Sequence, residues 1–179
     1  MKKILLIILS LTLLLSGCGK KPGEGLILLH KGSANIEFLK DVWREETQID
    51  LPNDVEIEVL FDDFSAEEYA GSSLCIANFE KSEYSDSMIS QIELQENWKK
   101  SPIDEKCKQY LTEAVQKAGI ALPDFENGYY MGKFVCWIDN EEKIIYSPDE
   151  PTDIEIITVS YWDETAKIMY YYCLVPQIS

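Results

Sequence analysis

The segment that decides the fold reads Ile154-Glu-Ile-Ile-Thr-Val-Ser-Tyr-Trp162, then Asp163-Glu-Thr-Ala166, then Lys167-Ile-Met-Tyr-Tyr-Tyr-Cys-Leu-Val175. Two runs rich in β-branched and aromatic residues flank four mostly polar residues, which is typical of two antiparallel strands joined by a short loop. Successive side chains of a strand point to opposite faces, so the three consecutive tyrosines place rings on both faces of a sheet. The segment therefore predicts a C-terminal β-hairpin.

Further strands are predicted upstream of this hairpin, over residues 55–61, 72–79, 129–138 and 144–147. The first of them alternates apolar and charged residues, as a half-buried strand does. Its core-facing side chains should be those of Val55, Ile57, Val59 and Phe61. Because the connections are short, we expect an α+β fold with a mainly antiparallel sheet of about five strands.

Three helices are predicted, and together they are expected to cover one face of the sheet. They span about residues 34–46, 87–96 and 103–118. In the third, apolar side chains recur at helical spacing along one stripe, and Gly119 is a natural C-terminal stop. Helices packed on one side of an antiparallel sheet are a common α+β arrangement.

The N-terminus has the three parts of a bacterial export signal. Met1-Lys2-Lys3 is positively charged, residues 4–15 are almost entirely apolar, and Leu15-Ser16-Gly17-Cys18 follows. The apolar run is too short for a transmembrane helix, which needs about 20 residues. The last four residues resemble the lipobox of bacterial lipoproteins. This resemblance implies a diacylglycerol thioether on Cys18 and cleavage just before it.

The lipobox predicts a division of the chain into a signal peptide (residues 1–17), a lipidated tether (residues 18–25) and a single α+β domain (residues 26–179). The tether is rich in glycine, which favours flexibility. Acyl chains on Cys18 place the domain at the outer face of the cell membrane. The outer membrane is the alternative location if the source is Gram-negative.

The charge balance limits the class of partner. The chain has 16 basic and 32 acidic residues, a net charge of −16, and removal of the signal peptide takes away two further lysines. Such an acidic surface argues against nucleic acid as a partner, since nucleic-acid binding needs basic patches. The expected partners are the membrane, through the lipid on Cys18, and a cell-wall glycan or envelope protein.

Few residues offer catalytic or redox chemistry, and no cofactor is expected. His30 is the only histidine, and it lies close to the tether rather than beside a candidate nucleophile. Four cysteines other than the lipidated one are far apart, without a C-x-x-C pair. These four cysteines are Cys75, Cys107, Cys136 and Cys173. We interpret them as small core residues, while the three possible disulfide pairings among them remain open.

The densest acidic group follows the first predicted strand and consists of Asp62, Asp63, Glu67 and Glu68. Hard cations bind several carboxylate oxygens, so these four residues are candidates for a calcium site, although the EF-hand spacing is absent. A glycosidase acid pair is a second interpretation. A solvated acidic loop without metal is the third and the favoured one.

Aromatic residues gather in the terminal strands. If helices cover only one face of the sheet, some rings stand on the open face and can stack on sugars or contact a protein. The candidates for such an aromatic patch are Tyr129, Tyr161 and Tyr171. The alternative is that tyrosines simply favour strands and pack across them.

Three motifs carry a wider resemblance: Asn127-Gly128-Tyr129-Tyr130, Glu96-Asn97-Trp98-Lys99-Lys100-Ser101-Pro102, and Tyr161-Trp162-Asp163 leading to Tyr170-Tyr171-Tyr172. Over residues 26–175 the chain resembles a group of small uncharacterised exported or membrane-attached domains of low-G+C bacteria. The resemblance implies a helix, two strands, two helices and a terminal hairpin. It implies no activity and no catalytic residues.

The leading hypothesis is a lipid-anchored envelope lipoprotein whose domain is a non-enzymatic binding or structural module. One alternative is an exported carboxylate-dependent hydrolase, which needs converging acids and a raised pKa. Another is a small solute-binding lipoprotein. The chain is short for two lobes around a ligand and lacks alternating βαβ units, which disfavours the latter.

Overall fold

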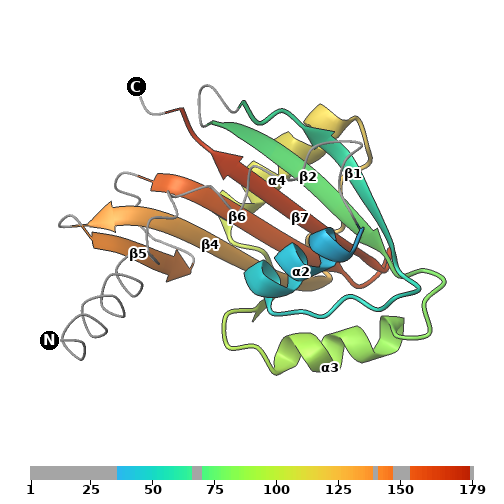
Figure 1. Ribbon diagram of the computed structural model, residues 1–179. Helices are drawn as coiled ribbons and strands as arrows, with labels where there is room; N and C mark the ends of the chain where they lie inside the picture. The colour runs from blue at the N-terminus through green and yellow to red at the C-terminus, as the bar shows by residue number, and fades with distance from the viewer. Residues whose placement is uncertain (1–35, 66–69, 139–140, 147–153, 178–179) are drawn as a thin grey trace, which may run out of the picture.

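The computed structural model describes residues 36–65, 70–138, 141–146 and 154–177. Within these ranges the chain forms three α-helices, one 3-10 helix and an antiparallel β-sheet (Figure 1). The α+β class predicted from the sequence is confirmed. In chain order the elements are α2 (Ile36–Thr47), β1 (Glu56–Asp62), β2 (Gly71–Asn78), η1 (Ser85–Ser87), α3 (Met88–Glu93), β3 (Lys99–Lys100), α4 (Glu105–Ala118), β4 (Gly128–Ile138), β5 (Glu141–Tyr146), β6 (Ile154–Asp163) and β7 (Ile168–Val175).

The sheet has seven strands in the described part of the chain, more than predicted. Its order is β1-β2-β7-β6-β4, and β3 and β5 both pair with the remaining edge of β4. The unexpected strand is β3, in which Lys99 pairs with Tyr130 and Lys100 pairs with Tyr129. A strand of two residues is too short to show an alternating pattern, so the sequence did not reveal it.

The helices cover both faces of the sheet, so the prediction that they share one face is wrong. Trp43 of α2 and Met88 and Ile92 of α3 belong to one buried cluster. Cys107 and Leu111 of α4 belong to a second cluster on the opposite face. Figure 1 shows α2 in front of the sheet and α4 behind it. The central strands are apolar at successive positions, and each apolar face must be buried against another layer.

The predicted C-terminal hairpin is confirmed, and its strands β6 and β7 lie at the centre of the sheet. The buried carboxylate of Asp163 closes the turn, because its Oδ1 accepts hydrogen bonds from Thr165 N at 2.9 Å and Ala166 N at 2.8 Å. Its Oδ2 accepts a third from Asp124 N at 3.1 Å. One side chain therefore joins the hairpin to the segment that leads into β4.

β1 departs from simple alternation at a register shift between Val59 and Phe61. Val55, Ile57 and Val59 pack on the α2 side of the sheet, as predicted. Leu60 and Phe61 pack on the α4 side instead. The prediction that Phe61 shares a face with Val59 is wrong, since a bulge adds a residue and reverses the faces beyond it.

The predicted helix positions are confirmed, although the ends differ by a few residues. α4 begins after Asp104, whose carboxylate accepts hydrogen bonds from Lys106 N and Cys107 N. It ends at Gly119, which takes the left-handed conformation with φ 71°. α3 has only six residues, and η1 precedes it. No helix in the described ranges is both long and apolar enough to cross a membrane.

Candidate functional site

An open groove lies between the loop that joins α2 to β1 and the segment that leads through η1 into α3. Its volume is about 500 Å³, which is within the range of ligand-binding clefts. It combines several carboxylates with an exposed aromatic ring, which makes it the candidate binding site. The lining residues are Asp50, Leu51, Pro52, Asn53, Asp54, Glu83, Tyr84 and Gln91.

The first wall of the groove is a turn that is fastened to the folded body. Leu51 is buried in the cluster beneath α2 and α3. Lys40 of α2 donates from Nζ to Pro52 O at 3.0 Å and to Asn53 Oδ1 at 3.2 Å. Val55 N donates to Pro52 O at 3.3 Å. Because the turn is tied to α2 and to the residue before β1, this wall is preformed.

The second wall is held by the residues around Tyr84. Phe79 is fully buried, and its ring meets the ring of Trp162 edge-on with the centroids 5.2 Å apart. Ser82 Oγ accepts a hydrogen bond from Tyr84 N at 3.2 Å, and Ser87 Oγ donates to Tyr84 O at 2.9 Å. The backbone of Tyr84 is therefore fixed, while its side chain is 45% exposed.

The groove is acidic, since Asp50, Asp54 and Glu83 line it and no basic residue does. Arg44 lies beside the groove, with its Nη1 3.8 Å from Asp50 Oδ1. Its Nη2 forms a hydrogen-bonded ion pair with Asp41 Oδ1 at 2.6 Å. Arg44 and Lys40 together offset part of the negative charge at the α2 side of the groove. Among the described residues, neither Asp54 nor Glu83 has a recorded ion pair.

The three tyrosines that were predicted to form an exposed aromatic patch are buried instead. Their exposed fractions are 6% for Tyr129, 0% for Tyr161 and 1% for Tyr171. Tyr129 and Tyr171 belong to the cluster on the α2 side, whereas Tyr161 belongs to the cluster on the α4 side. The predicted patch is therefore wrong, because both faces of the sheet carry helices.

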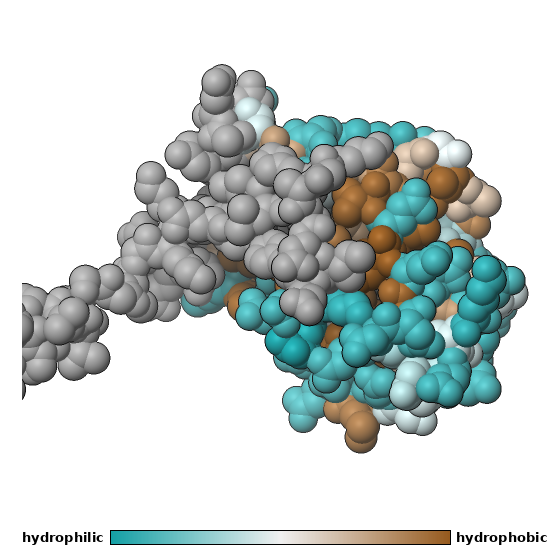
Figure 2. Space-filling view, turned by 45° about the vertical axis from the view of Figure 1, so that its right-hand side comes forward, coloured by the Kyte–Doolittle hydropathy of each residue, from teal (hydrophilic) through white to brown (hydrophobic). Residues whose placement is uncertain are grey.

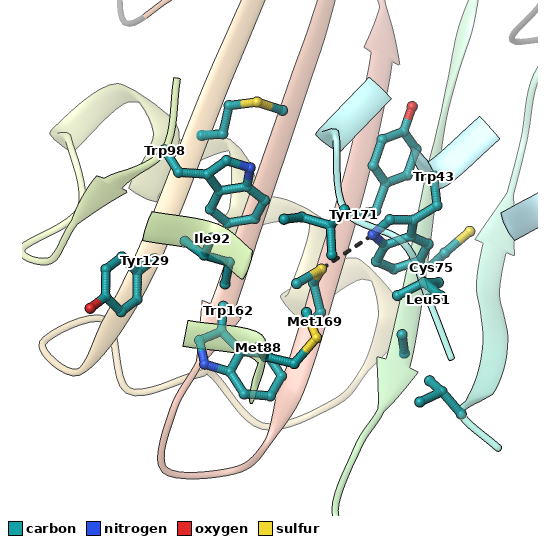
Figure 3. Packing of buried hydrophobic residues seen from close by; sticks show 14 of the residues in the cluster. Trp43, Leu51, Cys75, Met88, Ile92, Trp98, Tyr129, Trp162, Met169 and Tyr171 are labelled. Atoms are coloured by element: carbon teal, nitrogen blue, oxygen red, sulfur yellow. Dashed lines mark hydrogen bonds between the residues drawn. The ribbon is translucent and has the colours of Figure 1, made fainter. Parts of the chain in front are cut away.

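Figure 3 shows Tyr171 beside Trp43 of α2, and Tyr129 farther away in the same cluster. The rings of Trp43 and Tyr171 lie with their centroids 5.5 Å apart. Burial raises the pKa of Tyr171 well above its ordinary value. Tyr129 donates from its hydroxyl to Glu93 Oε1 at 2.7 Å, and this bond raises the pKa of Tyr129 to about 12. Both hydroxyls stay protonated at neutral pH and have structural rather than catalytic surroundings.

The calcium candidates do not form a metal site within the described residues. Glu67 and Glu68 lie outside those residues. Asp62 ends β1, where its Oδ1 accepts a hydrogen bond from Phe64 N at 3.2 Å. Across the ranges that the structure describes, no three histidine, cysteine, aspartate or glutamate side chains are arranged to hold a metal ion.

Asp63, the remaining calcium candidate, is bound to the end of α4. It forms an ion pair with Lys117 Nζ, and its Oδ1 accepts from Ser72 N at 2.6 Å and Ser72 Oγ at 3.1 Å. Burial by itself raises the pKa of Asp63, but the hydrogen bonds from Lys117 and Ser72 outweigh it and hold the pKa below its ordinary value. The hydrogen bond from Asn127 likewise lowers the pKa of Asp124. A general acid needs a raised pKa, so these two groups do not support the hydrolase hypothesis.

The four cysteines of the domain are buried, and none of them forms a disulfide in the described residues. Cys75 and Cys173 lie on the α2 side of the sheet, and Cys107 and Cys136 lie on the α4 side. Burial raises the pKa of Cys75 and of Cys107 to about 12, and it raises that of Cys173 further. These surroundings agree with the interpretation of the four thiols as small core residues.

Cys18 and His30 lie outside the described residues. Sequence reasoning did not identify the groove. The two walls come from segments that are well separated in the chain, and nothing in the local pattern shows that they meet. The only sign of the groove in the sequence was the pair of acidic residues, Asp50 and Asp54, on either side of Leu51-Pro52-Asn53.

No protein-family model, curated protein or solved structure matches this chain. The resemblance to small exported domains of low-G+C bacteria therefore stays a prediction.

Proposed function

We propose that this chain is a bacterial lipoprotein, anchored through lipid on Cys18 to the outer face of the cell membrane. The observation that carries the anchor is the sequence Leu15-Ser16-Gly17-Cys18 behind a positive start and a short apolar run. Two or more acyl chains on one residue hold a protein stably at a bilayer. In a Gram-negative source, the outer membrane is the alternative site of attachment.

The role proposed for the folded domain is non-enzymatic binding at the cell envelope. The groove lined by residues 50–54 together with Glu83, Tyr84 and Gln91 supports this role, because it is preformed, open and lined by groups that recognise a ligand. The partners under consideration are an envelope protein and a cell-wall glycan. Asp63 and Asp124, whose pKa values are lowered, are engaged in structural hydrogen bonds and provide no general acid. Because of the groove, binding is the function that the described geometry supports best.

Metabolic labelling with palmitate tests the anchor. The wild-type chain should incorporate label and fractionate with membranes, and its mature N-terminus should be Cys18. The Cys18→Ala variant should do neither, while a Cys75→Ala variant should still be labelled, since it removes a thiol that lies in the core. Label in the Cys18→Ala variant would refute the anchor.

A pull-down from intact envelopes tests the binding role. The lipidated chain should retain a protein or glycan that the Cys18→Ala variant, released from the membrane, retains poorly. If neither form retains a partner under mild detergent conditions, the binding role is wrong even where palmitate labelling succeeds. The two experiments therefore judge the two halves of the proposal separately.

A further inference from the structure

The electrostatics of the groove narrow the class of ligand that it can accept. Asp50, Asp54 and Glu83 line one concave surface. The cations of Arg44 and Lys40 lie at the α2 side of the groove, against Asp50 and the turn, whereas Asp54 and Glu83 form no ion pair within the described residues. Like charges gathered in a concavity raise the local potential, which concentrates ligands of opposite charge and repels ligands of the same charge. A phosphate, a nucleic-acid strand or an acidic peptide is therefore a poor occupant, and a cation is a good one.

Tyr84 adds a second recognition element that is independent of the carboxylates. Its backbone is fixed by Ser82 and Ser87, but 45% of its surface remains exposed to solvent. The negative face of an aromatic ring attracts ammonium and guanidinium groups. A fixed backbone removes part of the entropy cost of ordering the ring when a ligand binds to it.

The shape and the remaining lining favour a chain-like cation over a bare metal ion. A groove of about 500 Å³ is far larger than a metal ion. The described residues also hold no cluster of three metal-coordinating side chains. Pro52, which is half-buried, provides apolar surface next to the carboxylates. An aliphatic stem packs on such a surface while its charged end stays among polar groups, which is the behaviour of lysine and arginine.

We propose that the groove binds an extended polypeptide segment through a lysine or arginine side chain. Asp54 and Glu83 neutralise the cation, and the stem lies against Tyr84 and Pro52. The inference rests on the proposed binding role of the domain, and it names the partner as a basic peptide rather than a glycan. Because the groove opens to solvent, the bound segment can belong to a larger protein.

Calorimetric titration of the full chain in non-ionic detergent with tetralysine amide tests this site. The matched ligand is the same peptide acetylated on every amine, the N-terminal one included, which keeps the backbone and stems but removes the charges. We expect saturable binding of tetralysine amide with one site per chain and no binding of the acetylated peptide. Binding should weaken as salt rises, because salt screens exposed charges.

Two variant pairs separate the groove from the general acidity of the surface. Asp54→Asn with Glu83→Gln should weaken binding about tenfold or more, since two charge-assisted contacts are lost. Glu96→Gln with Glu126→Gln removes the same charge from exposed positions outside the groove lining and should weaken binding less than about twofold. Tyr84→Leu should weaken it about two- to fivefold through loss of the ring face. Thermal melting confirms that each variant is folded.

Three results of the titration overturn the inference. They are no binding of tetralysine amide, equal binding of the acetylated peptide, and equal weakening by the two charge-removing pairs. If the Asp54→Asn, Glu83→Gln variant keeps the envelope partner of the wild type, the binding role stands and the assignment to a basic peptide in this groove fails. If palmitate labelling fails while tetralysine amide binds the groove, the anchor fails and this inference stands.

Discussion

Trp43 of α2 donates its indole N–H to Sδ of Met169 in β7, across 3.2 Å of buried interior (Figure 3). The two residues lie far apart in the sequence, and their contact fixes α2 on the centre of the sheet. The ring of Trp43 also packs against Tyr171. This helix also supplies Lys40, which holds the turn that forms one wall of the groove. Helix α2 therefore connects the packing of Trp43 in the core with the position of the groove wall that Lys40 holds.

Trp43→Ala should lower the free energy of unfolding by about 3–5 kcal/mol, because it leaves a cavity under α2. Met169→Leu keeps the volume and loses only the sulfur acceptor, so it should cost less than about 1.5 kcal/mol. Urea denaturation followed by circular dichroism measures both. The half-buried Val42 on the same helix provides a control, and equal losses in Trp43→Ala and Val42→Ala would contradict this packing.

Gly128→Ala should prevent folding or destabilise the domain severely. A Cβ at this position would lie 1.9 Å from the backbone oxygen of Trp162, and backbone on a central strand cannot move away. Gly119→Ala is the matched control, since a Cβ there meets nothing within 4 Å and only the left-handed backbone is strained. Its expected cost is about 1 kcal/mol. Comparable yields and melting temperatures for the two variants would show that β4 and β6 are paired differently in solution.

The ion pair between Asp63 and Lys117 should make stability depend on pH in the acid range. The folded pKa of Asp63 is depressed below the ordinary value of 3.8. Its contribution is therefore fully present above pH 3.8 and is lost as the pH falls through the lower folded value. Because half of the Asp63 side chain is exposed, the effect should stay within about 1 kcal/mol.

Thermal melting of Asp63→Asn from pH 6 to pH 2.5 measures this contribution. The variant should melt below the wild type at pH 6, and the two curves should converge as the pH falls below 3.8. Asp86→Asn serves as the control, since the Asp86 side chain is 96% exposed and lies 3.9 Å from Lys167. If the difference in melting temperature between Asp63→Asn and the wild type widens toward low pH, the pKa of Asp63 is not depressed in the folded state and the prediction is wrong.

The thiols of the folded domain should react slowly with an aromatic disulfide reagent at pH 8. Burial raises the pKa of Cys75 and Cys107 to about 12, so the reactive thiolate is scarce, and all four thiols are shielded from solvent. Four thiols should react at once when the mature lipidated chain is unfolded in denaturant. A count of two or none would reveal disulfides, and a fifth thiol would show that Cys18 carries no thioether.

Much of the secondary structure was predictable because each element has a strong local signal. The hairpin around Asp163, the stripe along α4 and the stop at Gly119 all follow from periodicity and turn chemistry. The strand β3 was not predictable, since Lys99 and Lys100 pair only because β4 offers a free edge. The register shift after Val59 was hidden for a similar reason, because a bulge depends on the partner strand.

The distribution of helices over the two faces could not be read from the chain. An apolar stripe shows that a helix buries one side, but it does not say which face of the sheet receives it. That uncertainty produced the wrong aromatic patch, since Tyr129, Tyr161 and Tyr171 are exposed only if one face is bare. Figure 2 shows a largely hydrophilic described surface with a hydrophobic area beside the atoms drawn in grey.

The sequence by itself determined the α+β class and the C-terminal hairpin, because these depend on residues that are neighbours in the chain. The export signal before Cys18 stays a prediction from the sequence. Only the tertiary structure decided which tyrosines are buried, and only it brought Asp54 and Glu83 to one groove. Such meetings depend on packing between distant segments, where the burial of Leu51, Phe79 and Trp162 sets the position of polar residues beside them.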